Sequence, residues 1–316
     1  MGFLENISAS QEQFSVVTYA VFLRDAGREI LEVRTTPQLT QALTARIAGE
    51  ASRAADLVVV PFEPALEPIA GHVLKLAVEE SAEAQELWAQ VKKNDVELLS
   101  DFDELRAAEY VVYAVSTRGG ELSLFVQATP RAGWVKPKGG LLAAVTGTAL
   151  DVAKPETLFE FPTKFALVMS ANQILILDQR SAAKFLGLDA VTRQKAREMA
   201  TELVSHLRID GLEEFLETVS GDANMHSKLR SAQRKMAESP AYKQAMTTDH
   251  LVKFIATRED ITLEVRESED GPILVHDSSP KGRWMLLKLL DDDYLMSTLT
   301  QEQYEANSKQ TVRTER

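Results

Sequence analysis

Two hairpin patterns followed by a long helical tract constrain what this chain can fold into. Alternating apolar residues on either side of a Gly-Gly turn predict one β-hairpin from strands 110–116 and 122–127. A second hairpin is predicted from strands 165–169 and 174–178. Helical periodicity then continues over residues 182–255. Two hairpins followed by a helical tract predict an α+β protein.

The other elements complete this architecture. Breaks in the helical tract are expected at Gly211, Gly221 and Pro240. Residues 131–162 are rich in Gly and Pro and are expected to form loops with short strands. Further strands are predicted at 16–22, 30–33, 57–60, 261–265 and 273–276, and further helices at 37–54 and 81–93. We therefore expect a mixed, mainly antiparallel β body with a helical insertion and a β/α C-terminal tail. We expect two domains, an acidic N-terminal α/β lobe over 1–185 and a C-terminal lobe over 186–316.

The charges are distributed unevenly along the chain. The net charge is −12, and residues 1–110 hold 19 acidic and 9 basic residues. Residues 224–257 instead hold six basic and two acidic residues. Because electrostatic attraction acts over roughly 10 Å at 0.1 M salt, a local basic region can bind nucleic acid on an acidic protein. Two ordinary solvated faces are the alternative interpretation.

Several classes of protein are disfavoured by what the sequence lacks. It has no cysteine, which excludes disulfides, thiolate zinc sites, iron–sulfur clusters and a cysteine nucleophile. It has no signal-peptide pattern at its N-terminus and no apolar run of the ~20 residues that span a bilayer. No phosphate-binding glycine motif, HExxH motif or nucleophile elbow is present. We expect a soluble protein without a cofactor, located in the cytoplasm.

The strongest candidate for nucleic-acid contact is a basic helix around residues 224–238. Its apolar stripe is expected to consist of Met225, Leu229, Ala232 and Met236, packed against the protein body. Lys228 and Lys235 flank that stripe on one side, and Arg230 and Arg234 lie roughly opposite. We expect all four cations to contact phosphates.

Two other segments carry cations beside an aromatic residue. The glycine-containing segment from residue 131 to 140 suits backbone contacts together with base stacking on tryptophan. Its expected contact residues are Arg131, Trp134, Lys136 and Lys138. Lys281 and Arg283, beside Trp284, form a third and smaller cluster. For each segment the alternative interpretation is an ordinary surface with a packing tryptophan.

The arrangement of acidic residues gives little indication of metal-dependent chemistry. A nuclease needs clustered carboxylates around a divalent cation. Asp260 and Glu264, with Arg266 nearby, are the closest approach to such a cluster, but the spacing of the acids is loose. Three consecutive aspartates, Asp291, Asp292 and Asp293, could bind a hard cation or solvate a turn. We therefore assign neither a catalytic residue nor a metal site.

The C-terminal region from residue 284 carries a family resemblance. An apolar run, Met285 to Leu290, meets the three aspartates, and a Ser-x-Leu-Thr segment and Tyr304 follow. The second hairpin ends in Ile-Leu-Ile-Leu-Asp and precedes a helix carrying Phe185. Together these features, over roughly residues 160–310, resemble component B of the Kiwa anti-phage defence system. They are mostly packing residues, so they identify a family better than a mechanism.

The resemblance implies a DNA-binding effector of bacterial anti-phage defence that has no enzymatic activity. It also implies self-association into a homodimer, assembly with a membrane-embedded component A-like subunit, and recruitment to the inner membrane by that partner. The apolar run from Met285 is expected to be buried, either in the core of its lobe or at a subunit interface. Two other functions stay open: a metal-dependent nuclease, and a protein-interaction scaffold that does not bind DNA.

Overall fold

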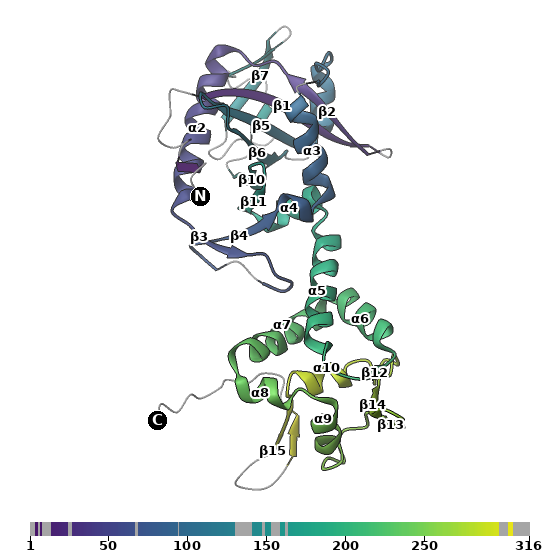
Figure 1. Ribbon diagram of the computed structural model, residues 1–316. Coiled ribbons are helices and arrows are strands. Elements are labelled where there is room, and N and C mark those ends of the chain that lie inside the picture. The colour runs from purple at the N-terminus through teal and green to yellow at the C-terminus, as the bar shows by residue number, and fades with distance from the viewer. Residues whose placement is uncertain are drawn as a thin grey trace. The chain divides into compact units, whose positions relative to one another are not determined.

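The computed structural model describes residues 4–5, 7, 14–24, 27–66, 69–93, 95–129, 141–146, 149–152, 159–161, 164–296 and 303–305 (Figure 1). The chain divides into two compact units. The first consists of Met1–Phe62 and Pro68–Asp189, and the second of Glu63–Glu67 and Ala190–Arg316. The boundary expected from the sequence, after residue 185, falls within the last turn of a helix of the first unit.

An eight-stranded sheet forms the centre of the first unit. Its strand order is β2-β1-β5-β6-β10-β11-β4-β3, and every neighbouring pair is antiparallel except β3 and β4. The strands are β1 (Phe14–Arg24), β2 (Gly27–Val33), β3 (Val58–Pro61), β4 (His72–Ala77), β5 (Tyr110–Thr117), β6 (Leu122–Ala128), β10 (Leu167–Met169) and β11 (Gln173–Ile176). Both predicted hairpins, β5–β6 and β10–β11, are confirmed.

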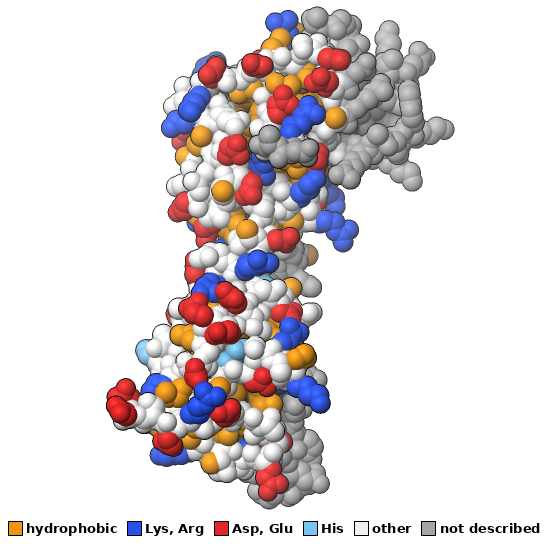
Figure 2. All heavy atoms as spheres, turned by 90° about the vertical axis from the view of Figure 1, so that its right-hand side faces the viewer, with side chains coloured by type: hydrophobic (Ala, Val, Ile, Leu, Met, Phe, Trp, Pro, Cys, Tyr) orange, Lys and Arg blue, Asp and Glu red, His pale blue; other side chains and the backbone are white. Residues whose placement is uncertain are grey.

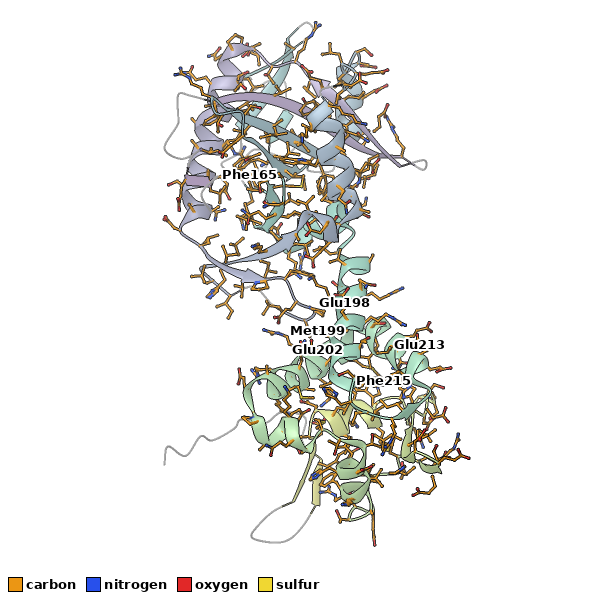
Figure 3. All side chains as sticks on the ribbon, in the orientation of Figure 1. Phe165, Glu198, Met199, Glu202, Glu213 and Phe215 are labelled. Carbon is orange, nitrogen blue, oxygen red and sulfur yellow. The ribbon has the colours of Figure 1, made fainter. Side chains whose placement is uncertain are left out.

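Helices pack against this sheet. Helix α2 (Pro37–Ala55) buries Leu39, Leu43 and Ile47 in the core, and Phe165 lies among the strands beside it (Figures 1 and 3). Its first turn is stabilised by Thr36, whose side chain accepts a hydrogen bond from the Leu39 amide at 3.3 Å. On the other face, Phe185 meets Tyr110 edge to face with ring centroids 4.9 Å apart. The helices of that face are α3 (Ala82–Lys93) and α4 (Gln179–Leu186).

Smaller elements complete the first unit. Two short 3₁₀ turns are η1 (Val78–Glu80) and η2 (Phe102–Ala107). A separate three-stranded sheet has the order β8-β7-β9. Its strands are β7 (Leu141–Thr146), β8 (Ala149–Val152) and β9 (Phe159–Phe161). The described parts of the segment 131–162 therefore contain the short strands expected there.

The second unit is mainly helical. Its helices are α5 (Leu188–Val204), α6 (Leu212–Gly221), α7 (Ala223–Glu238), α8 (Pro240–Ala245), α9 (Thr248–Ile255) and α10 (Met285–Leu290). All three predicted breaks are confirmed. Gly211 precedes α6 with φ +77°, Gly221 ends it, and Pro240 occupies the first turn of α8. Only a glycine adopts such a positive φ at low cost, which explains the break at Gly211.

Short strands accompany these helices. One sheet has the order β12-β14-β13, formed by β12 (Ile209–Asp210), β13 (Val265–Ser268) and β14 (Gly271–Val275). A further pair joins β15 (Tyr294–Met296) to β16 (Gln303–Glu305). The strand predicted at 261–265 is wrong over most of its length, because β13 begins only at Val265. Ile261 and Leu263 are buried in irregular backbone, so their alternation reflects burial in the core and not a strand.

The apolar run of the C-terminal region completes the core of the second unit. Leu286, Leu287, Leu289 and Leu290 are all buried, together with Phe215 (Figure 3). Burial of this run is thereby confirmed, and within one chain it packs in the core. Over the described residues the architecture is α+β with a mainly antiparallel sheet, as the sequence predicts.

Candidate nucleic-acid interface

Helix α7 carries the four cations that the sequence places around an apolar stripe. Asp222 precedes the helix and accepts a hydrogen bond from the Asn224 amide at 3.0 Å. The predicted stripe is confirmed: Met225, Leu229 and Ala232 are fully buried, and Met236 is partly buried against the same core. This packing directs the flanking cations to two different sides of the helix.

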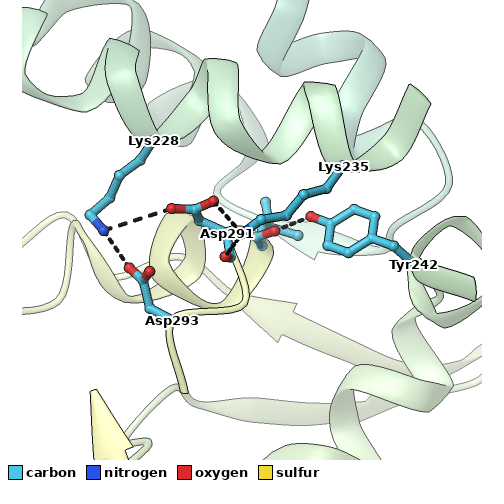
Figure 4. A network of polar contacts seen from close by, with 6 residues as sticks. Lys228, Lys235, Tyr242, Asp291 and Asp293 are labelled. Carbon is cyan, nitrogen blue, oxygen red and sulfur yellow. Dashed lines mark hydrogen bonds and ion pairs between the residues drawn. The ribbon is translucent and has the colours of Figure 1, made fainter. Parts of the chain in front are cut away.

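Lys228 and Lys235 extend towards the three-aspartate segment (Figure 4). The ammonium of Lys228 lies 2.5 Å from Asp293 Oδ2 and 3.8 Å from Asp291 Oδ2. The ammonium of Lys235 lies 2.8 Å from Asp291 Oδ1 and also donates to the carbonyl oxygen of the same residue. Asp293 is 2% exposed and Lys228 14% exposed, so these ion pairs are largely shielded from solvent.

Tyr242 of α8 joins the same network. Its hydroxyl donates a hydrogen bond to the carbonyl oxygen of Leu290, the last residue of α10 (Figure 4). Burial raises the pKa of Tyr242 strongly, and the negative charges of Asp291 and Asp292 raise it further. The hydroxyl therefore keeps its proton at any physiological pH. The network connects α7, α8 and the end of α10.

The aspartate segment thus differs from both sequence-based expectations, a cation site and a solvated turn. Asp291 and Asp293 are buried, and lysine ammonium groups supply their counter-charge. A buried carboxylate needs such compensation because transfer out of water is costly. For Lys228 or Lys235 to bind phosphate, an existing ion pair would have to break. Their assignment as DNA contacts stays a prediction, and the geometry favours a structural role.

Arg230 and Arg234 face a different environment, a groove of about 630 Å³ in the second unit. Both arginines line it together with Lys243 of α8. Arg234 is exposed and has no hydrogen bond or ion pair with any described residue. Arg230 Nε lies 2.8 Å from Glu63 Oε2, and both side chains are about 40% exposed (40% and 42%). An exposed pair of this kind contributes little stability, so Arg230 can exchange the carboxylate for another anion.

Neutral polar groups and two acids, Glu63 and Glu202, complete the groove. Ser227, Ser231 and Gln233 line it from α7, and Glu202, labelled in Figure 3, lines it from α5. Gln233 Nε2 donates to Glu202 Oε2 at 3.1 Å. Hydroxyl and amide groups beside arginine are suited to contact phosphate oxygens.

Lys243 was missed as a site residue at the sequence level. It belongs to the basic region 224–257, but it lies on α8, beyond the break at Pro240. No helical spacing rule relates residues on two separate helices. Only the packing of α8 beside α7 brings Lys243 to the groove.

The two other predicted clusters do not add to the groove. Arg131, Trp134, Lys136 and Lys138 lie outside the described residues. Arg283 pairs with Asp222 at 3.0 Å, and its Nε is buried without a hydrogen-bond partner among the described residues. Lys281 is exposed, and Trp284 packs against the core of the second unit. Neither Lys281 nor Arg283 lines the groove.

The carboxylates considered for nuclease chemistry are engaged in ion pairs. Asp260 accepts two hydrogen bonds from Arg258, at 2.8 and 2.7 Å, and this arginine lowers the pKa of the carboxyl. Glu264 pairs with Arg266 at 2.7 Å. Among the described residues, no group of three or more His, Asp or Glu side chains is placed to hold a metal ion.

On the face shown in Figure 2, acidic and basic side chains are interspersed on each unit. In the described part of the chain, no helix is both long and apolar enough to cross a membrane.

Comparison with known proteins gives one match. The sequence model of a family described as Kiwa protein KwaB-like matches residues 106–300. The matched region begins just before β5 and includes α7, the three aspartates and the groove residues other than Glu63 and Ala65. Comparison with the curated proteins and with the solved structures found no match.

Proposed function

Because this chain belongs to the Kiwa protein KwaB-like family, whose members are components of Kiwa anti-phage defence, we propose that it acts in that defence by binding DNA. We also propose that it catalyses no reaction itself. We further propose that it works as a cytoplasmic homodimer with a membrane-embedded Kiwa component A-like subunit, which recruits it to the inner membrane. Family membership supports action within a multi-component system. DNA binding, the dimer and the partner are our inferences.

The observation that carries DNA binding is the groove that contains Arg230, Arg234 and Lys243. The three cations of this groove outnumber its two acids, Glu63 and Glu202, which favours a polyanion, and Arg234 has no competing ion pair among the described residues. Guanidinium groups form two parallel hydrogen bonds to phosphate, which fixes the backbone geometrically. Serine and glutamine side chains supply further donors to phosphate oxygens.

This mode of binding reads the DNA backbone and not its sequence. The residues that line the groove include no aromatic side chain on which a base could stack. Contacts to phosphates position a protein on DNA but carry no direct sequence information. We therefore propose sequence-independent binding whose affinity falls steeply as salt rises, because each phosphate contact releases condensed counterions.

A gel-shift experiment with labelled duplex DNA separates this function from the two alternatives. We expect wild-type protein to shift the DNA in EDTA, and to leave it uncut when Mg²⁺ replaces EDTA. The variant Arg230→Ala/Arg234→Ala/Lys243→Ala should lose most of the shift. Arg193→Ala is the matched control, since Arg193 is an exposed arginine on α5 outside the groove.

Each other outcome contradicts part of the proposal. Cleavage in Mg²⁺ by wild-type protein, lost on substitution of Asp260 or Glu264, would show a nuclease. No shift at low salt would leave the protein-interaction scaffold as the better description. Equal weakening by Arg193→Ala and the triple variant would show that general charge, and not the groove, attracts DNA.

A further inference from the structure

A second groove lies within the first unit, where α3 meets the ends of several strands. Its volume is about 850 Å³, within the ~300–1,000 Å³ that is usual for small-ligand sites. Trp88 and Lys92 line it from α3, and Tyr19 lines it from β1. Asn172, in the turn between β10 and β11, and Gln173, the first residue of β11, also line it. The DNA-binding proposal uses none of these residues.

Trp88 provides a surface for a planar ligand. Trp88 is only partly buried, although three of its neighbours on α3, Ala84, Leu87 and Val91, are buried. Stacking of a nucleobase on an exposed aromatic ring is strongly favourable and does not depend on which base is bound. Tyr19 is 2% exposed, and burial, followed by the nearby charge of Glu32, raises the pKa of its hydroxyl. The tyrosine therefore remains a neutral hydrogen-bonding group.

Asn172 and Gln173 offer side-chain amide groups that match the edge of a purine. Each side-chain amide carries both a donor and an acceptor. Asn and Gln pair in this way with the N6 and N7 positions of adenine. The Gln173 side chain forms no hydrogen bond with the described residues, and Asn172 is exposed. From the described residues, the Asn172 amide oxygen accepts only a long hydrogen bond, 3.4 Å, from Ser170.

Lys92 adds a positive charge at a suitable place. It lies four residues after Trp88 on α3, so both side chains lie on the same side of the helix. Its side chain is exposed and has no ion pair with any described residue. A phosphate attached to a base on Trp88 would therefore find a cation one helical turn away.

We propose that this groove binds a purine nucleotide, with adenine preferred, through stacking on Trp88, amide contacts from Asn172 and Gln173, and a phosphate contact from Lys92. The nucleotide could be free or the 5′-phosphorylated end of a single strand, since both present the same base and phosphate. This site is separate from the groove on α7 and goes beyond the DNA-binding function.

The test is calorimetric titration of the full-length protein with 5′-AMP, adenosine, 5′-CMP and 5′-phosphorylated tetradeoxyadenylate. We expect AMP to bind at least about fivefold more tightly than CMP, and Trp88→Ala to weaken AMP by at least about fivefold. Trp88→Phe should keep most of the affinity and serves as the folded control. Lys92→Gln should weaken AMP about tenfold but leave adenosine unchanged, whereas Lys93→Gln, an exposed lysine outside the groove, should change neither.

Repeating the AMP titration in Arg230→Gln/Arg234→Gln/Lys243→Gln separates this inference from the proposed function. Unchanged AMP affinity in that variant, with loss in Trp88→Ala, supports a separate nucleotide site whether or not the protein binds DNA. In the same variant, tighter binding of AMP than of the tetranucleotide would indicate a free nucleotide as the ligand, and the reverse would indicate the 5′-phosphorylated end of a single strand. The proposal would be overturned if neither AMP nor the tetranucleotide bound, or if Trp88→Ala left their affinity unchanged.

Discussion

The ammonium of Lys235 lies 2.8 Å from a carboxylate oxygen of Asp291, a residue 56 positions later in the chain. Lys228 makes the matching contact with Asp293. The basic helix and the aspartate segment, which are separate features of the sequence, are therefore one electrostatic unit in the fold. Two of the four α7 cations that the sequence assigns to DNA, Lys228 and Lys235, are held by buried acids of the same chain.

The Lys228–Asp293 pair should show strong coupling in a double-mutant cycle. Asp293→Leu leaves the Lys228 ammonium largely buried without its nearest counter-charge, and Lys228→Met leaves the carboxylate in the same state. Each single change should destabilise the fold by about 3–5 kcal/mol, and the double variant should recover much of that loss. Urea unfolding of the four proteins measures these values. Additive losses would mean that the two side chains do not interact.

The same double variant tests which cations contact DNA. Because Lys228 already pairs with carboxylates, Lys228→Met/Asp293→Leu should leave the slope of log affinity against log salt unchanged. Arg234→Ala should reduce that slope by roughly 0.9, the value for one phosphate contact on duplex DNA. Fluorescence anisotropy over a series of salt concentrations gives both slopes. A reduced slope in the double variant would show that Lys228 contacts DNA.

The fold could be predicted from sequence wherever a local signal sets the structure. The Gly119-Gly120 turn marks the β5–β6 hairpin. Gly211 and Pro240 mark helix ends, because glycine adopts a positive φ that other residues avoid and proline has a fixed φ and no amide hydrogen. Strand β4 (His72–Ala77) was missed. Its residues Val73, Leu74 and Leu76 are buried, and because two of them are adjacent, they break the alternation that marks a half-exposed strand.

The candidate site could be predicted only in part, since it depends on contacts between distant segments. Helical spacing correctly separated Lys228 and Lys235 from Arg230 and Arg234. It could not show that Asp291 and Asp293 approach the two lysines, because that contact depends on where α10 packs. Nor could it associate Lys243 with the arginines across the break at Pro240. Periodicity describes one helix at a time, whereas a groove is a property of several.

Leu290 should be essential for the core of the second unit. Its side chain is fully buried among the apolar residues that surround Phe215. Leu290→Asp would place an unpaired charge there at a cost of several kcal/mol, on the order of 3–5. Leu212→Asp is the control, because Leu212 is 38% exposed in the first turn of α6. Thermal unfolding should show a large fall in melting temperature only for Leu290→Asp. Equal melting temperatures would place Leu290 outside the core.

His276 should make stability depend on pH. The imidazole is 8% exposed, its two nitrogens have no hydrogen-bond partner among the described residues, and its ring lies edge-on to that of Phe215, with the ring centroids 5.5 Å apart. Burial lowers the pKa of His276 below 6.5, an effect that Asp277 and Glu214 offset only partly. The unfolded chain therefore takes up a proton near pH 6.5 that the folded protein does not yet bind.

Stability from this group is therefore fully present above pH ~6.5 and declines as pH falls towards the folded pKa, with a slope of at most about 1.4 kcal/mol per pH unit. Urea unfolding between about pH 5.5 and 7.5, above the range where most carboxylates titrate, should show this decline in wild-type protein. His276→Leu should flatten it, because leucine takes up no proton in either state. His206→Gln, at an exposed position, should leave it unchanged. An identical decline in His276→Leu would assign the pH dependence to another group.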